Sequence, residues 1–352
     1  MTQDTPATVR VWNTTDQSGF DSLKLEEQPL PELGDSQVLV KIQGASLNYR
    51  DLIIVKGLYK LGVQNNVIPG SDGAGTVLAV GKNVKRFQTG DKVITLFNQG
   101  HIGGSLDNVS VKTGLGGALD GTLRTVAAFD EHGLVRMPSN LSFTEAATLT
   151  CAGLTAWNAL FGLTDKKLLA GQWVLTQGTG GVSIFGVQFA KAAGAKVIAT
   201  TSSSEKAKLL EKLGADHIIN YKETPEWGDK AKELTGGVGV DHVIEVAGPA
   251  SMRQSLASVK IDGVITIIGF VGGMEDDKEP GFLENLNRLC TTRGILVGNR
   301  GQMEEMCRAV EANPEKLRPV LDAKVFAFDQ VKDAYEYQWS GQHQGKVVIE
   351  IN

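Results

Sequence analysis

The sequence has few of the residue types that build metal sites or disulfide frameworks. Its 352 residues include three cysteines, and no two of them form a C-x-x-C pair. The five histidines are also scattered, with no two of them three or four positions apart. These spacings argue against disulfides and against a cysteine-rich structural zinc lobe. The local sequence therefore predicts no metal site.

The chain also lacks a long apolar run and an excess of positive charge. No window has the length and hydrophobicity of a signal peptide or a membrane-spanning helix. With 35 Lys and Arg against 40 Asp and Glu, the net charge of -5 provides no basic surface for nucleic acid. We therefore expect a cytoplasmic protein that binds neither membranes nor nucleic acid, and at roughly 150 residues per domain we expect two domains.

Glycine, by contrast, is abundant, and the 42 glycines often punctuate strand-like runs. Residues 1–142 read as a β-rich region, with strands expected at 38–42 and 73–80 between turns rich in Pro and Gly. Residues 100–121 contain seven glycines and little periodicity. That segment predicts a long surface loop.

The pattern changes at Phe143. Residues 143–161 have helical spacing, and strand and helix segments then alternate from 173 to 270. Repeated β-α-β units predict an α/β fold with a doubly wound parallel sheet. Further helices and a final strand at 346–352 are expected to return to the first domain. The predicted domains are therefore 1–142, 143–298 and the returning segment 299–352.

The segment QGTGGVS at 177–183 follows one predicted strand and opens a helix. The first glycine permits a tight turn, the second lets the backbone approach a pyrophosphate, and the N–H groups at the helix start attract the anion. Ser183 replaces the usual third glycine, and a turn without any ligand is the alternative interpretation. The β-α-β context favours a dinucleotide site made of Gly178, Thr179, Gly180, Gly181, Val182 and Ser183.

The end of the next strand indicates which dinucleotide is bound. NAD sites usually place an acidic side chain there, whereas this chain has TTSSSEK at 200–206. Small hydroxyl groups and a lysine can bind a 2′-phosphate, and two or three such bonds would favour NADP by roughly tens- to hundreds-fold. Alternatively the serines only cap a helix and the lysine is solvated. We predict NADPH in preference to NADH, bound through Thr201, Ser202, Ser203, Lys206 and Tyr221.

Several longer stretches carry a resemblance to a known family. They include GASLNYRDL (44–52), IPGSDGAGTVLAVGKNV (68–84), CAGLTAWNALFG (151–162) and QGTGGVSIFGVQFAKAAGAKVIAT (177–200). The chain resembles the medium-chain dehydrogenase/reductase superfamily, on its zinc-free side with the quinone oxidoreductases and a "zinc-type alcohol dehydrogenase-like" branch. The resemblance implies a GroES-like, β-rich catalytic domain, an inserted Rossmann nucleotide-binding domain, and a homodimer.

The same resemblance implies roles for individual residues. Zinc-dependent relatives place their metal ligands at the positions held here by Asn48, Ser71 and Cys151, so we expect no zinc. It also implies that the nicotinamide is contacted by Thr155, Ala247, Gly269 and Phe270, with weaker candidates in Asn299 and Lys346.

Without zinc, alcohol oxidation loses its main activator: zinc lowers the pKa of bound water by roughly 9 units, which corresponds to ~12 kcal/mol. Reduction of a conjugated carbon–carbon double bond, or of a quinone, needs mainly hydrogen bonds to a developing oxyanion. Asn48 can donate one, and the resemblance nominates Tyr59 as a second donor or acid. Alternatively Asn48 caps the helix that begins there and Tyr59 only packs.

We predict a zinc-independent NADPH oxidoreductase for an enone, carbonyl or quinone substrate. One alternative is a zinc-free carbonyl reductase or alcohol dehydrogenase. The other is a protein that binds NADPH without turnover.

Overall fold

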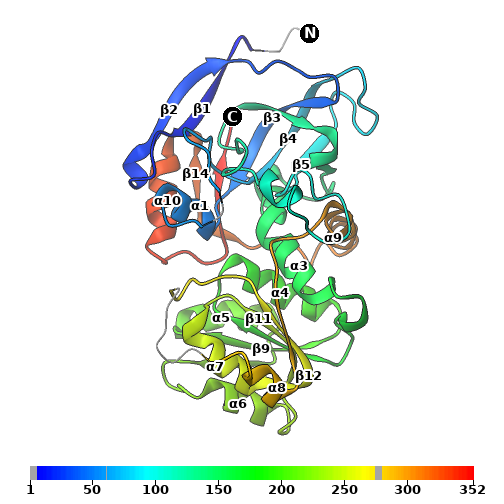
Figure 1. Cartoon of the computed structure of the whole chain (residues 1–352), viewed down its shortest axis with the longest axis vertical. Coiled ribbons are helices and arrows are strands. Elements are labelled where there is room, and N and C mark those ends of the chain that lie inside the picture. Colours follow the sequence, from blue (N-terminus) through cyan, green and yellow to red (C-terminus); the bar gives the residue numbers. More distant parts are fainter. Residues whose placement is uncertain (1–5, 61, 274–279) are drawn as a thin grey trace. The chain divides into compact units, whose positions relative to one another are not determined.

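The computed structural model describes residues 6–60, 62–273 and 280–352. Its contacts define two compact units: Met1–Leu154 with Asn299–Pro314 and Arg318–Asn352, and Thr155–Gly298 with Glu315–Leu317 (Figure 1). The first unit thus extends past the predicted junction at 142/143 and includes α2 (Phe143–Ala147). The reason is the close approach of α2 to Gly44, where a Cβ would lie 2.6 Å from the carbonyl carbon of Phe143.

The first unit is built around an antiparallel core of strands. Among the described residues, its main sheet has the order β14-β15-β3-β4-β5-β7, with β6 also paired to β3, and β1 pairs with β2 separately. The strands are β1 (Thr8–Thr14), β2 (Leu23–Pro29), β3 (Gln37–Ser46), β4 (Asp72–Val80), β5 (Lys92–Thr95), β6 (Val126–Asp130), β7 (Leu134–Arg136), β14 (Leu321–Ala327) and β15 (Lys346–Glu350). Besides α2, the helices are α1 (Tyr49–Val55), α9 (Arg300–Ala312) and α10 (Val331–Trp339).

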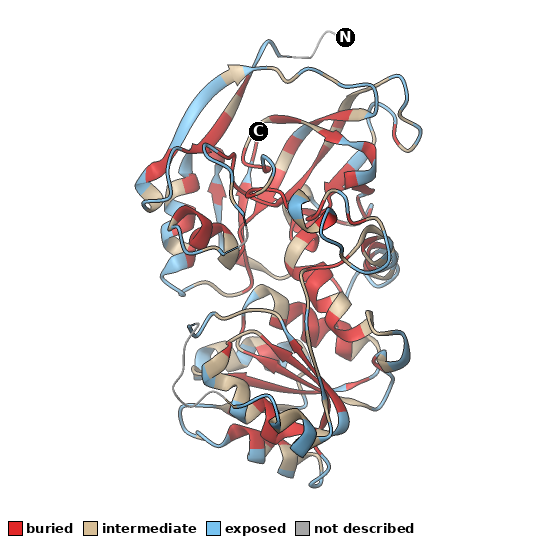
Figure 2. Ribbon diagram, viewed as in Figure 1, coloured by how far each residue is buried: buried red, intermediate tan, exposed pale blue. Residues whose placement is uncertain are grey.

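Strand β15 places a segment distant in sequence between β14 and β3 of this sheet. It runs parallel to β14 and antiparallel to β3, where Val348 pairs with Ser46. On the other side of β3, Ser46 pairs with Asp72 of β4. The start of β15, the end of β3 and the start of β4 therefore meet, and the surrounding strands are buried (Figure 2).

The second unit contains a parallel sheet of six strands within the described residues, in the order β10-β9-β8-β11-β12-β13. The chain proceeds outward from β8 in one direction and then from β11 in the other, which is the doubly wound arrangement with its switch point between those two strands. The strands are β8 (Trp173–Gln177), β9 (Lys196–Thr201), β10 (His217–Asn220), β11 (Val240–Glu245), β12 (Val259–Ile267) and β13 (Thr291–Gly294). The helices are α3 (Leu154–Phe161), α4 (Gly181–Ala192), α5 (Ser204–Lys212), α6 (Trp227–Leu234), α7 (Pro249–Ser258) and α8 (Glu284–Arg288).

The predicted fold class is thus confirmed. In the ranges that the structure describes, no helix has the length and apolar character needed to cross a bilayer.

Two local segments differ in detail from expectation. The helical spacing of residues 143–161 corresponds to α2 and α3, with a π-helical turn at Leu149–Gly153 between them that the spacing did not predict. The segment 100–121 is irregular but is not simply a surface loop, since residues 114–117 are buried. Its glycines allow backbone to pack on backbone: a Cβ at Gly121 would lie 1.9 Å from the carbonyl oxygen of Gly70.

Candidate active site

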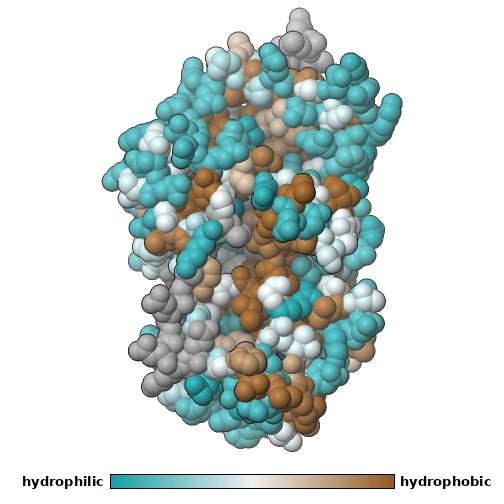
Figure 3. All heavy atoms as spheres, in the orientation of Figure 1, coloured by the Kyte–Doolittle hydropathy of each residue, from teal (hydrophilic) through white to brown (hydrophobic). Residues whose placement is uncertain are grey.

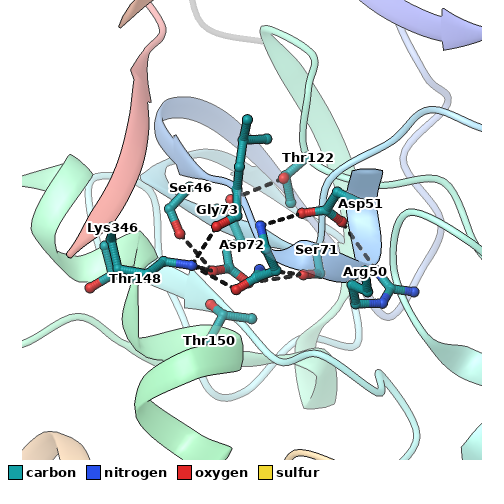
Figure 4. A network of polar contacts seen from close by, with 12 residues as sticks. Ser46, Arg50, Asp51, Ser71, Asp72, Gly73, Thr122, Thr148, Thr150 and Lys346 are labelled. Carbon is teal, nitrogen blue, oxygen red and sulfur yellow. Dashed lines mark hydrogen bonds and ion pairs between the residues drawn. The ribbon is translucent and has the colours of Figure 1, made fainter. Parts of the chain in front are cut away.

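Four polar residues of the first unit form a closed circuit, which we call the polar ring: Asn48, Ser71, Asp72 and Lys346. The Lys346 ammonium donates to Asn48 Oδ1 at 2.6 Å, and Asn48 Nδ2 donates to Ser71 Oγ at 3.3 Å. Ser71 Oγ donates to Asp72 Oδ1 at 2.9 Å, and Asp72 Oδ2 lies 3.5 Å from the ammonium. All four residues are buried, and Figure 4 shows the network around Asp72.

Neighbouring groups hold the ring from outside. Ser46 Oγ donates to Asp72 Oδ2 at 2.6 Å, and Lys346 also donates to the carbonyl of Leu47 at 2.6 Å. Thr95 Oγ1 donates to the Ser71 carbonyl at 2.9 Å, so the turn before β4 is fixed as well. Because every charged group in the ring has an oppositely charged or hydrogen-bonding partner, the burial of these charges is compensated.

Asn48 stands at the N-cap position of α1, yet its side chain does not cap the helix. The first turn is held instead by Asp51, whose Oδ2 accepts from the Asn48 backbone N–H at 2.8 Å. The Asn48 amide is therefore available to the polar ring. The alternative that Asn48 serves only as a helix cap does not match its contacts.

Asp51 is itself a buried carboxyl group with a shifted pKa. Burial raises the pKa of Asp51 to about 6, an effect that the neighbouring Arg50 partly offsets. The folded state then holds this proton more tightly than the unfolded state, whose pKa is near 3.8. The contribution of Asp51 to the free energy of unfolding is thus fully present below pH 3.8 and lost as the pH rises through 6, by ~3 kcal/mol for two units.

Urea unfolding of the wild type and of Asp51→Asn across pH 4 to 7 checks this expectation. The difference in unfolding free energy between the two proteins should shift in favour of Asp51→Asn as the pH rises, because asparagine retains an acceptor for the Asn48 N–H without a titrating group. A difference that stays constant over this range would contradict the assignment.

The positions expected to hold zinc in related enzymes are brought together, but their chemistry does not suit the metal. Asn48 Oδ1 already faces the Lys346 ammonium, and Ser71 is a neutral hydroxyl bonded within the ring. Cys151 is the one thiol at these three positions, and burial, followed by the nearby Asp72, raises its pKa to about 12. In the part of the chain that the structure describes, no group of three or more His, Cys, Asp or Glu side chains could hold a metal ion. These residues do not fit zinc.

Tyr59 is half-buried beside the guanidinium of Arg50. Arg50 lies 5.1 Å from the centre of the Tyr59 ring and 4.5 Å from that of Phe97, and it donates to the carbonyl of Leu115 at 2.9 Å. Burial acts to lower the pKa of Arg50, but Tyr59 and Asp51 outweigh it and raise the pKa overall. The Tyr59 ring thus packs on a permanent cation rather than in a purely apolar core.

In the second unit, the predicted phosphate cradle follows β8. Gly178 has a φ of +74°, and a Cβ at Gly178 or Gly180 would meet nothing within 4 Å. Gly180 is the N-cap of the twelve-residue helix α4, which begins at Gly181 and includes Val182, while Thr179 between the two glycines is buried. Open space over a glycine turn at a helix N-terminus suits a pyrophosphate. These residues therefore fit a dinucleotide.

Ser183 and Gly186 together replace the third glycine of the motif. The Ser183 hydroxyl donates to the carbonyl of Gln177 at 2.6 Å, which ties the helix start to β8. Close helix–sheet packing is instead achieved at Gly186, where a Cβ would lie 2.5 Å from Ile244 Cδ1. Gly186 was not among the predicted site residues, although its place one turn after Ser183 is a signal in the sequence.

The residues predicted to select NADP gather where β9 and β10 end. The backbone N–H of Tyr221, after β10, donates to the carbonyl of Thr201 at 3.0 Å. Ser203 is the N-cap of α5 and accepts from the Lys206 N–H at 3.4 Å, and Ser202 lies between Thr201 and this cap. Ser203 therefore does cap a helix, as the alternative interpretation expected. Lys206 is half-buried, one turn into that helix. The structure thus brings the five predicted residues together at the carboxyl ends of β9 and β10.

A buried carboxylate that the sequence analysis overlooked organises the switch point. Glu245 ends β11 with no exposed surface and accepts from Gln177 Nε2 at 2.7 Å, from Ser251 Oγ at 2.6 Å and from Ser255 Oγ. Its Oε1 also accepts from the N–H groups of residues 247 and 248, both at 3.0 Å. Glu245 therefore fixes the turn after β11 against the strand that leads into the cradle.

The residues expected near the nicotinamide are found in both units. Ala247 and the Gly269–Phe270 turn follow β11 and β12, and a Cβ at Gly269 would lie 3.2 Å from the Val246 carbonyl. Thr155 is buried in α3. Asn299, in the first unit, caps α9 by accepting from the Gln302 N–H at 2.9 Å and donates to the Gly104 carbonyl at 3.2 Å.

The doubly wound sheet, the glycine cradle and the antiparallel unit together define a nicotinamide-dependent oxidoreductase. Comparison with known proteins agrees. Residues 34–139 match the alcohol dehydrogenase GroES-like domain, and residues 181–312 match the zinc-binding dehydrogenase domain. The chain belongs to the medium-chain dehydrogenase/reductase superfamily.

Individual relatives span nearly the whole chain. A zinc-type alcohol dehydrogenase-like protein of Schizosaccharomyces pombe is 49% identical over 95% of this chain and 97% of its own length. The NADPH-dependent alkenal/one oxidoreductase of Arabidopsis thaliana chloroplasts is 32% identical over 98% of this chain and 80% of its own. A crystal structure of a candidate alcohol dehydrogenase from Sinorhizobium meliloti 1021 superposes with a TM-score of 0.89 at 40% identity, covering 98% of this chain and 99% of the other.

Proposed function

We propose that this protein is a zinc-independent, NADPH-dependent reductase of carbon–carbon double bonds conjugated to a carbonyl group, or of quinones. The polar ring is the observation that carries the proposal. At the positions where related enzymes bind zinc, it presents hydrogen-bonding groups and a fixed ammonium instead of metal ligands.

The chemistry required of the protein follows from the reaction. Bound NADPH supplies a hydride, and its addition to the β-carbon of an enone leaves negative charge on the carbonyl oxygen. Asn48 has one N–H directed to Ser71, and among the described residues its second N–H has no acceptor. That N–H can donate to the developing oxyanion, and the phenol of Tyr59 can donate a second bond or the final proton.

The residues at the carboxyl ends of β9 and β10 favour NADPH over NADH. At the end of β9, where an NAD enzyme usually places an acidic side chain for the ribose hydroxyl, this chain has Thr201, Ser202 and Ser203. The Arabidopsis relative is an NADPH-dependent oxidoreductase, which supports the same coenzyme preference.

Replacing Lys206 with alanine tests the coenzyme assignment. We expect the Kd for NADPH to rise by about 10-fold or more, while the Kd for NADH stays within about twofold, because only the 2′-phosphate loses a charge-assisted hydrogen bond. Fluorescence titration of both coenzymes measures the two constants. The control is Lys208→Ala, an exposed lysine of the same helix, and equal losses for NADPH and NADH would contradict the assignment.

Product analysis tests the reaction class. A conjugated enone and its saturated ketone are supplied separately with NADPH, and each product is identified. Conversion of the enone to the saturated ketone, with the ketone itself unchanged, is the expected result. Reduction of the ketone to an alcohol would replace the proposal with carbonyl reduction that uses Tyr59 as the acid; if neither compound reacts, a quinone series completes the test.

We further propose a homodimer formed through the second unit. In the described part of the sheet β13 lies at the edge, and near it the surface around α8 is hydrophobic (Figure 3). Phe282 is 83% exposed and Leu286 is 66% exposed, which is unusual for a monomer surface. Light scattering should give twice the 37.6 kDa chain mass, and Leu286→Glu should shift the protein toward the monomer. A monomeric wild type at micromolar concentration would contradict this proposal.

A further inference from the structure

Lys346 is a buried cation whose partners belong to its own unit. It is 4% exposed, and its ammonium lies 2.6 Å from the Leu47 carbonyl, 2.6 Å from Asn48 Oδ1 and 3.5 Å from Asp72 Oδ2. An ammonium has three N–H groups and no acceptor. These three oxygens therefore account for all of its donors.

This contact determines which way the Asn48 amide faces. The oxygen and nitrogen of an asparagine side chain can exchange places by a rotation of about 180°, and only the hydrogen-bonding partners decide between the two orientations. Lys346 can only donate, so it requires the amide oxygen on its side. The NH2 group must then face away from the ammonium.

The opposite end of the amide is restricted in the same sense. The Ser71 hydroxyl gives its hydrogen to Asp72 Oδ1 at 2.9 Å, so Ser71 can only accept from Asn48. Asp72 is in turn held by Ser46 and faces Lys346. The ring is thus directional, and its two ends together fix the Asn48 amide with its oxygen toward Lys346 and its NH2 group toward Ser71.

We propose that Lys346 is a positioning residue that acts on the reaction through Asn48, an inference that rests on the proposed role of Asn48 as oxyanion donor. Lys346 locks the amide orientation, and its positive charge beside Oδ1 polarises the amide so that the free N–H donates more strongly. The ammonium thereby influences the substrate oxygen without touching substrate or coenzyme.

A double-mutant cycle tests whether Lys346 acts through Asn48. The variants are Lys346→Met, Asn48→Leu and the double variant. Lys332→Met is the control, because Lys332 forms its ion pair with the fully exposed Asp21. We expect Lys346→Met to lower kcat by about 10- to 100-fold and to leave the Kd for NADPH within about twofold. In the Asn48→Leu background, the same substitution should lower kcat by less than about threefold.

If the kcat losses of Lys346→Met and Asn48→Leu multiply in the double variant, the proposal is overturned. A rise in the NADPH Kd of Lys346→Met at unchanged kcat would also overturn it, because Lys346 would then be a coenzyme contact. If Lys346→Met does not fold, Lys346→Gln takes its place in the cycle, since glutamine keeps two N–H donors but removes the positive charge. The cycle uses whichever acceptor the wild type reduces, whether enone, quinone or ketone. An incorrect substrate class therefore shows in the product analysis, and an incorrect role for Lys346 shows in the cycle.

Discussion

Replacing Asn48 with leucine is expected to lower kcat for an enone by about 100- to 1,000-fold, the usual effect of removing one preorganised oxyanion donor. The side chains are similar in size, so packing around the 9% exposed Asn48 changes little. The NADPH Kd should stay within about twofold, because the predicted phosphate cradle is formed by a separate unit. Single-turnover kinetics with saturating NADPH measure the hydride-transfer step directly.

The matched control is Ser71→Ala. It removes the acceptor on one side of Asn48 but leaves the Lys346 contact that fixes the amide oxygen. We expect a loss of kcat of less than about 10-fold in this variant. Equal kcat values for Asn48→Leu and the wild type would show that the oxyanion is stabilised elsewhere, and Tyr59 would then be the residue to replace.

The second large effect is expected at Glu245, on protein stability. Glu245→Ala should lower the free energy of unfolding by about 3–5 kcal/mol, because its removal takes the shared acceptor from a buried set of five donors. The Ser255 hydroxyl and the N–H of residue 248 lose their acceptor outright, while Gln177, Ser251 and the N–H of residue 247 lose one of two acceptors. Urea unfolding followed by circular dichroism measures the loss.

Glu245→Gln serves as the control, since its amide oxygen still accepts from the backbone N–H groups. We expect it to lose less than half as much unfolding free energy as the alanine variant. Glu245→Ala should also weaken NADPH binding, because Glu245 accepts a hydrogen bond from the Gln177 side chain, just before the predicted phosphate cradle. Wild-type stability in Glu245→Ala would refute the view that this carboxylate organises the switch point.

Much of the second unit could be predicted from the sequence because its pattern is local. Strand β8 (Trp173–Gln177), helix α4 (Gly181–Ala192) and strand β9 (Lys196–Thr201) follow one another as the alternation expected from residue 173 requires. Parallel β-α-β units repeat a short-range alternation of apolar strands and amphipathic helices, so each element can be recognised by itself. The superfamily assignment was confirmed for the same reason, since its motifs are continuous stretches of sequence.

The polar ring could not be predicted because no local pattern contains it. Strand pairing brings Lys346 to Asn48 across 298 positions, and the sequence analysis considered that lysine only for the nicotinamide. Glu245 was overlooked because a buried acid at the end of a strand looks the same in sequence as an exposed one. The π-helical turn before α3 was missed because its extra residue hardly disturbs helical spacing.

The position of β15 in the sheet also has a consequence for how the protein is made. A ribosome produces β3, α1 and β4 early, then the whole second unit, and only afterwards the strand that carries Lys346. Until β15 inserts between β14 and β3, Asp72 has no counter-ion at this point and the Asn48 amide can turn either way. The second unit has its own core and can fold in the meantime. The growing chain should therefore complete the predicted dinucleotide cradle before the polar ring can form.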